Sequence, residues 1–236
     1  MIDILSICQE AADMTAAARP DDLFDKGIQH NAIFLSVVKS ELDSLVRYGD
    51  WQALIKEGSF WTVTDKTFYG FDEVASDFYA LIHNTIYIKN SAENIIGALA
   101  PAEWMKRKYQ TFDDGKICFK IDNNGFRFLK TPPQNLKIVF MYRSNAVCVD
   151  GKSFEPKSAV SKNTDVPIFD AYLVKLGIIW RFLKRSGMDY EEEYNEYMRE
   201  LKKRFGLEMN VKDIRLANGL DEGDGDGAVQ IVFKGC

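Results

Sequence analysis

The sequence predicts an α+β protein: a helical bundle built from both chain ends, with an inserted antiparallel β domain and an extended C-terminal tail. Apolar residues recur at helical spacing in residues 1–58 and again in 151–206. Residues 59–150 are instead rich in aromatic and β-branched side chains, with turn residues between the runs. Residues 207–236 show no useful helix. Because each set of helices is too small to close a core alone, we expect the two sets to pack together.

The first helical part is predicted to contain a long helix over residues 20–48. Pro20 suits a first helical turn, the two aspartates after it would favour the positive end of the helix dipole, and Gly49 would end the helix. The buried stripe is predicted to comprise Ile28, Ala32, Leu35, Val38, Leu42, Leu45 and Val46. A shorter helix is expected over 4–18 and a further turn or two over 51–56.

The central region is predicted to form about six short strands. They are expected in the segments 59–65, 66–71, 77–90, 116–122, 125–131 and 135–144. The dipeptide Asn124-Gly125 is the strongest hairpin signal, because both residues tolerate the positive φ angles of a tight turn. One short helix is expected over 101–109, and the polar segment 151–167 is predicted to be irregular.

Two more helices are predicted before the tail. The first, from residue 169 to Gly187, is apolar nearly all round and is therefore expected to be central. Asp189 followed by Glu192 resembles a capping box that opens the last helix, and Gly206 would close it. The apolar face of the last helix, predicted to be a core or subunit contact, consists of Tyr190, Tyr194, Tyr197, Leu201 and Phe205.

Composition excludes several classes of protein. The chain has 236 residues and is 46% hydrophobic and 28% charged, which is typical of a globular protein and not of a disordered one. No apolar run is long enough to span a bilayer, and the N-terminus has no basic leader, so no secretory signal is expected. A net charge of −5 argues against tight nonspecific binding of nucleic acid. Four cysteines without a close pair are expected to be reduced thiols: Cys8, Cys118, Cys148 and Cys236.

Residues 146–153 (AVCVDGKS) match the spacing of a phosphate-binding loop, with alanine in place of the first glycine. Such a loop needs a helix that starts at its Lys-Ser pair, and Phe154 and the polar residues after it do not predict one. We therefore expect a chance match and no bound nucleotide. The two histidines, His30 and His83, belong to no catalytic or metal-binding motif and are expected to be structural.

Two acidic clusters are also predicted to have no catalytic role. The segment 221–227 resembles a calcium loop but lacks the closing glutamate, so we interpret it as an acidic linker. Residues 191–193, three glutamates, suit the first turn of a helix. The residues thus predict no catalytic group, metal or cofactor, and the chain is not expected to be an enzyme.

Several segments occur in an order that resembles one protein family. The dipeptide Asp50-Trp51 follows the long predicted helix, and a later strand ends in Tyr142-Arg143. The other matching segments are the aromatic stretches 60–64 and 67–71, the short helix at 100–104, the apolar helix 169–184 and the charged helix 190–197. Together, residues 20–206 resemble the head-to-tail adaptor proteins of short-tailed bacteriophages, the tail tubular protein A-like group.

The resemblance implies a structural role in the virion. Such adaptors form a ring of about twelve copies beneath the portal protein, extend the DNA channel and offer a platform for the tail nozzle protein. DNA would pass through only as cargo during ejection, and no membrane partner is implied. One departure is Gly70, where the family has a proline, which affects the local turn.

The tail, residues 207–236, is predicted to be an arm that docks on the portal or a neighbouring subunit. Val229, Ile231 and Phe233 share one face of a strand-like stretch, and an isolated strand needs a partner edge. A disordered terminus is the alternative for this segment. For the whole chain, the alternatives are an enzyme whose site is assembled from distant residues and a module that binds a peptide or glycan through its β domain.

Overall fold

The structure is a computed structural model that describes residues 1–25, 27–91, 95–109, 115–122 and 124–209. Its helices are α1 (Ile4–Met14), α2 (Gln29–Tyr48), α3 (Phe71–Val74), α4 (Pro101–Tyr109), α5 (Ala171–Arg185) and α6 (Glu191–Met209), with a 3-10 turn η1 (Gln52–Leu54). Its strands are β1 (Ile55–Trp61), β2 (Phe68–Gly70), β3 (Phe78–Leu81), β4 (Tyr87–Ile88), β5 (Phe119–Ile121), β6 (Gly125–Phe128), β7 (Lys137–Ser144), β8 (Cys148–Val149), β9 (Pro156–Lys157) and β10 (Val166–Pro167). Helices and antiparallel sheets are both present, so the predicted α+β class is confirmed.

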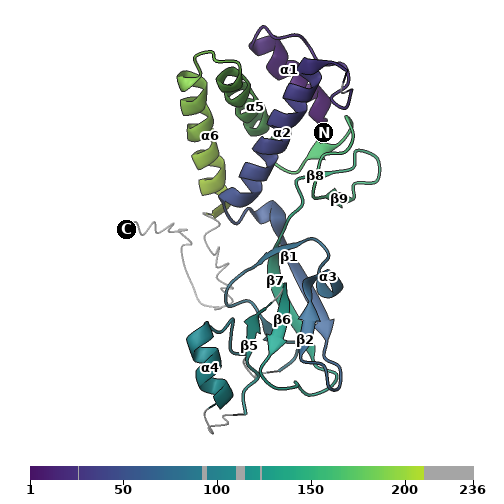
Figure 1. Cartoon of the computed structure of the whole chain (residues 1–236), viewed down its shortest axis with the longest axis vertical. Coiled ribbons are helices and arrows are strands. Elements are labelled where there is room, and N and C mark those ends of the chain that lie inside the picture. Colours follow the sequence, from purple (N-terminus) through teal and green to yellow (C-terminus); the bar gives the residue numbers. More distant parts are fainter. Residues whose placement is uncertain (26, 92–94, 110–114, 123, 210–236) are drawn as a thin grey trace, which may run out of the picture.

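Figure 1 shows α1, α2, α5 and α6 at one end of an elongated molecule and β1–β7 with α4 at the other. We call these two regions the helical part and the β part.

Helix α5 packs against α1, α2 and α6, as its apolar residues on nearly every face predict. The Asp170 side chain caps α5 by accepting hydrogen bonds from the backbone N–H groups of Tyr172 and Leu173, each at 3.1 Å. The rings of Phe34 and Phe182 stack at 4.8 Å between α2 and α5.

The long helix α2 begins at Gln29, so the predicted start near Pro20 is wrong. Local side-chain hydrogen bonds compete with helix formation in the preceding segment. The Asp22 carboxylate accepts from the N–H of Phe24 at 2.9 Å, and the Asp25 carboxylate accepts from that of Gly27 at 2.8 Å. Such bonds offer the backbone an alternative to helical pairing, which is why aspartate favours turns.

The β part contains a four-stranded and a three-stranded antiparallel sheet. In the first, the long strand β7 pairs with β1, β3 and β4, and Phe60 of β1 lies opposite Ile138. In the second, β6 pairs with β2 and β5, and the predicted hairpin between these last two strands is confirmed by the pairing of Ile121 with Phe126. Asn124 takes the positive φ of the turn, whereas Gly125 is already the first residue of β6. The predicted short helix is also confirmed, as α4.

Two other local predictions are wrong. The segment 151–167 is not irregular, because β9 and β10 both pair with β8 in a small antiparallel sheet. Helix α6 does not end at Gly206 and continues to Met209. The further turn predicted within 51–56 is present as η1, and β1 begins directly after it at Ile55.

Candidate functional site

The three arm residues predicted to make contacts, Val229, Ile231 and Phe233, lie outside the described residues. The same holds for the acidic segment 221–227 and for Cys236. The described residues instead present two arrangements with functional potential. One is the junction between the helical part and the β part, and the other is a cationic groove between α2 and α5.

The apparent phosphate-binding loop is a structural turn between β8 and β9. Strand β8 is followed by β9 at Pro156, and no helix starts at Lys152 or Ser153. The Asp150 carboxylate closes the turn by accepting from the backbone N–H groups of those two residues, at 3.0 and 3.3 Å. Hydrogen bonds from Lys162 and Lys157 hold the pKa of Asp150 well below its ordinary value. A carboxylate thus occupies the loop where a phosphate would need open N–H donors.

The two histidines and the thiols of Cys8 and Cys148 lie apart from both arrangements. His30 is half-buried on α2 and His83 is exposed on a loop. Burial raises the pKa of the Cys8 thiol, and burial with the nearby Asp165 raises that of Cys148 to about 12, so neither is a ready nucleophile. Across the described ranges, no group of three or more metal-binding side chains gathers, and no helix is both long and apolar enough to cross a bilayer.

The junction brings together residues that are far apart in the sequence. Trp51 is buried, its indole N–H donates to the Leu45 carbonyl at 2.7 Å, and its ring packs edge-on against Phe169 and Phe205. The adjacent Asp50 carboxylate accepts a hydrogen bond from Arg143 of β7 at 2.9 Å. The Asp-Trp and Tyr-Arg dipeptides noted in the sequence therefore meet where the two parts join.

A second polar cluster lies beside this junction, around Asp77. Its carboxylate accepts from the Lys56 ammonium at 2.5 Å, the Tyr142 hydroxyl at 2.6 Å and the Ser144 hydroxyl at 2.7 Å. Burial alone would raise the pKa of Asp77, but the three hydrogen bonds outweigh it and hold the pKa at about 2. The cluster links β1 and the end of β7 to the segment that precedes β3.

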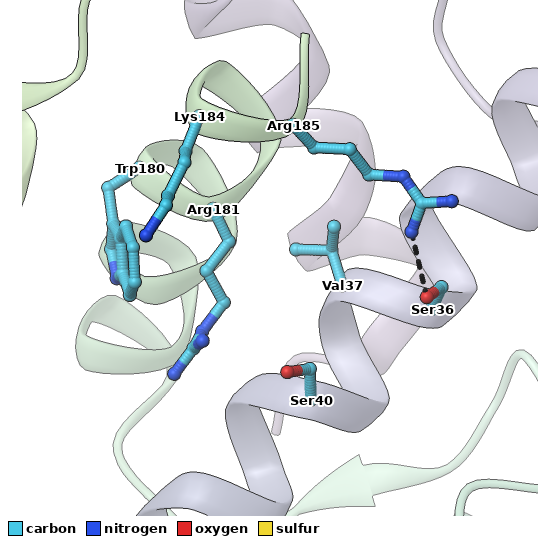
Figure 2. A pocket seen from close by; sticks show the side chains of 7 residues that line it. All are labelled: Ser36, Val37, Ser40, Trp180, Arg181, Lys184 and Arg185. Carbon is cyan, nitrogen blue, oxygen red and sulfur yellow. Dashed lines mark hydrogen bonds between the residues drawn. The ribbon is translucent and has the colours of Figure 1, made fainter. Parts of the chain in front are cut away.

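The groove between α2 and α5 has a volume of about 420 Å³. Figure 2 shows Ser36, Val37 and Ser40 of α2 facing Trp180, Arg181, Lys184 and Arg185 of α5. The Arg185 guanidinium donates to the Ser36 hydroxyl at 3.0 Å. Arg181 lies over the Trp180 ring at 4.5 Å from its centroid, and the Lys184 ammonium lies at 5.8 Å from the same centroid.

The three cations of the groove are not equivalent. Arg181 donates to the fully buried Glu41 carboxylate at 2.6 Å and to the Ser44 hydroxyl at 2.9 Å. Within the described part of the chain, Lys184 and Arg185 form no ion pair with a carboxylate. The groove therefore has two uncompensated positive charges beside two serine hydroxyls, an arrangement that suits an anionic ligand.

Glu41 is held between α2 and α5 by close packing. Burial raises its pKa above the ordinary value, and the hydrogen bond and charge of Arg181 oppose that shift. A side chain at Gly177 would collide with the Glu41 carboxyl, so the absence of a side chain there is what allows the carboxylate to fit. The pair of Glu41 and Arg181 thereby links α2 to α5 next to the groove, which Arg181 lines.

Sequence reasoning missed the groove residues because they were scattered through a helix chosen for its apolar pattern. A signal was present, since Arg181, Lys184 and Arg185 are spaced i, i+3 and i+4 and so share a helix face. Ser36 and Ser40, which line the groove from α2, are spaced i and i+4 and so also share a helix face. Only packing of α2 against α5 assigns the two sets to one groove.

Comparison with protein-family profiles and with curated proteins finds no match to this chain.

Proposed function

We propose that this protein is a head-to-tail adaptor of a short-tailed bacteriophage virion. In this proposal, copies of the chain form a ring between the portal and the tail nozzle and extend the DNA channel. The chain would have no enzymatic role and would work in the neck of the virion. Its architecture would be a bundle closed by helices from both chain ends, with the β domain inserted between them and the C-terminal arm extending outward.

The observation that carries the proposal is the meeting of the family-like segments at the junction. Asp50 and Arg143 are 93 residues apart and form an ion pair at 2.9 Å, next to buried Trp51. The resemblance was drawn from these dipeptides as separate segments. Their contact supports treating them as one structural unit that connects the helical part to the β part, as a ring subunit that joins two assemblies requires.

The chemistry of the described residues also favours a structural role over the enzymatic alternative. The clusters around Asp77 and Asp150 are satisfied by internal hydrogen bonds, and the thiols of Cys8 and Cys148 have raised pKa values. An overall charge of −5 suits a channel wall past which DNA slides. These features support the proposal without depending on the family resemblance.

The arm would provide the contact with the portal or a neighbouring subunit. Val229, Ile231 and Phe233 would lie on one face of an added strand, where backbone hydrogen bonds contribute affinity and alternate side chains contribute specificity. These residues lie outside the described ranges, so this step rests on the sequence.

The test is to image the purified chain alone and mixed with a portal ring, by mass photometry and negative-stain microscopy. We expect the chain to add a second ring to the portal. The variant V229S/I231S/F233S should lose this association while its melting temperature stays unchanged, and the control Q230S/V232S/K234S should retain it. A chain that stays monomeric in both settings and turns over a substrate would overturn the proposal.

A further inference from the structure

The groove between α2 and α5 has an excess of positive charge that the described residues do not neutralise. Glu41 balances Arg181, whereas Lys184 and Arg185 are exposed and have no carboxylate partner there. Ser36 and Ser40 add hydroxyl donors on the opposite wall. Among the described residues, the positive charges of Lys184 and Arg185 in the groove are therefore not balanced by a paired carboxylate.

The helix dipole explains only part of this charge. Lys184 and Arg185 lie in the last turn of α5, where cations are favourable. The dipole does not explain why they flank two serines of α2, or why Lys184 is held near the rings of Trp180 and Tyr190 at 5.8 and 5.6 Å. Figure 2 shows Arg185 reaching toward Ser36 of α2 and Lys184 lying beside Trp180. This arrangement is that of a receptor for a carboxylate-rich ligand.

Outside the described residues, the acidic segment 221–226 has matching chemistry. Four of the six residues at 221–226 are acidic and none is basic. Helix α6 ends at Met209 after 19 residues. Tyr190, which precedes α6, and Glu191 and Asn195 of its first turns line a neighbouring pocket with Lys184, so the groove lies near the start of α6. At about 1.5 Å per residue, α6 is roughly 28 Å long. The eleven residues 210–220 can span up to about 36 Å, so the acidic segment can reach the groove.

We propose that the acidic segment 221–226 docks in the groove between α2 and α5 of the same chain. Its carboxylates would face Lys184 and Arg185 and accept hydrogen bonds from the hydroxyls of Ser36 and Ser40. Contacts between exposed charges are weak individually, but a tethered segment is present at a high effective concentration. Because the docking depends on attraction between exposed charges, it should weaken as the salt concentration rises. This inference does not depend on the proposed function.

The test is carbodiimide cross-linking of the full-length chain, which joins a carboxylate to a neighbouring amine without a spacer, followed by mass spectrometry of the peptides. We expect segment 221–226 to couple to Lys184 about tenfold more than to Lys203. Tethering alone predicts the reverse, because Lys203 is nearer in the chain and its side chain is 67% exposed. At ~1 M salt, where the Debye length is about 3 Å, the preference for Lys184 should disappear.

Two single-charge variants distinguish docking in the groove from nonspecific attraction of the acidic segment to any nearby cation. Arg185→Gln should reduce the Lys184 product several-fold, whereas Lys39→Gln, which removes a cation that lines the adjacent pocket on α2, should leave it unchanged. Both residues are exposed, and circular dichroism verifies that each variant folds. A yield at Lys184 equal to that at Lys203, or insensitive to Arg185→Gln, would overturn the inference. A second control cross-links a mixture of ¹⁵N-labelled and unlabelled protein. Products that join a labelled to an unlabelled peptide would also overturn the inference, because they would place the segment on another copy of the chain.

Discussion

The helical part and the β part have hydrophobic cores of different composition. In the larger cluster, which lies in the helical part, most of the buried residues are aliphatic, whereas eight of the ten buried residues of the β cluster are aromatic. Helices of 15 to 20 residues present long apolar stripes, so many medium-sized side chains can share the burial. The short strands β2, β5 and β6 offer few inward positions, and these hold the rings of Tyr69, Phe119, Phe126 and Phe128. The longer strands β1 and β7 add Phe60, Phe140 and Tyr142, so the β part builds its core from few, large side chains.

The two parts also differ in how they hold charge. The helical part buries the Glu41 carboxylate completely and pairs it with Arg181 across two helices. The β part places Asp77 and Lys56 at its edge, where their side chains are 24% and 36% exposed. Breaking the buried pair should therefore cost much more than breaking the one at the edge.

The largest expected effect is from Phe126→Ala in the β part. Phe126 is fully buried and its ring contacts Phe60, Phe71, Phe119 and Phe140 at 5.0 to 5.7 Å. We expect the free energy of unfolding to fall by about 3–5 kcal/mol, measured by chemical denaturation. Ile121→Ala in the same hairpin is the control, because Ile121 is exposed and should cost under about 0.5 kcal/mol. Equal costs for the two variants would contradict an aromatic core centred on Phe126.

The next effect is from Arg181→Met in the helical part. It leaves the Glu41 carboxylate buried without its cation, and we expect a loss of about 3 kcal/mol. The double variant Glu41→Leu/Arg181→Met should recover most of that stability, because it removes both buried charges. If the double variant were as unstable as Arg181→Met alone, the cost would come from lost packing of the arginine chain.

The same carboxylate gives the helical part a defined pH dependence. Because burial raises the pKa of Glu41 in the folded state, the folded protein holds this proton more tightly than the unfolded chain. The resulting stabilisation is complete below the ordinary value of 4.5 and is lost as the pH rises through the raised folded pKa. The stability of the wild type relative to Glu41→Gln should therefore fall as the pH increases above 4.5.

A smaller loss of stability is expected for Asp77→Asn in the β part, and its dependence on pH is opposite to that of Glu41. The pKa of Asp77 is lowered from 3.8 to about 2, so its contribution is present above 3.8 and is lost as the pH falls toward 2. We expect Asp77→Asn to cost about 1 kcal/mol at neutral pH, a figure reduced for solvent screening. Thermal melts between pH 2 and pH 7 of both proteins should converge at the acidic end. A constant gap would show that the loss is not electrostatic.

The smallest effect is expected for Asp50→Asn at the junction. Asp50 is 51% exposed, so its ion pair with Arg143 should contribute under about 0.5 kcal/mol to the free energy of unfolding. Asp50→Ala, which also removes the hydrogen bond, is the matched variant. A loss above about 1 kcal/mol for Asp50→Asn would show that the junction is coupled to the core, and would sharpen the contrast with the buried pair at Glu41.

Patterns within short stretches of sequence predicted several elements correctly. The helix α4, the hairpin of β5 and β6 and the central position of α5 all follow from turn preference or from apolar spacing, which act over a few residues. The start of α2 was predicted too early because Pro20 and the aspartates after it favour turns as well as first helical turns. The small sheet of β8, β9 and β10 was missed because its strands have two residues each, and two residues are too few to show an alternation of apolar and polar side chains.

The alternation of apolar and polar residues therefore determined the α+β class, since burial of one face is a local requirement of each helix and strand. The groove, the junction and the buried pair were decided only by tertiary packing. Glu41 meets Arg181 across 140 residues and Asp50 meets Arg143 across 93. Each partner alone looks like an ordinary surface charge, because an ion pair depends on distance in space and leaves no periodic signal in the chain.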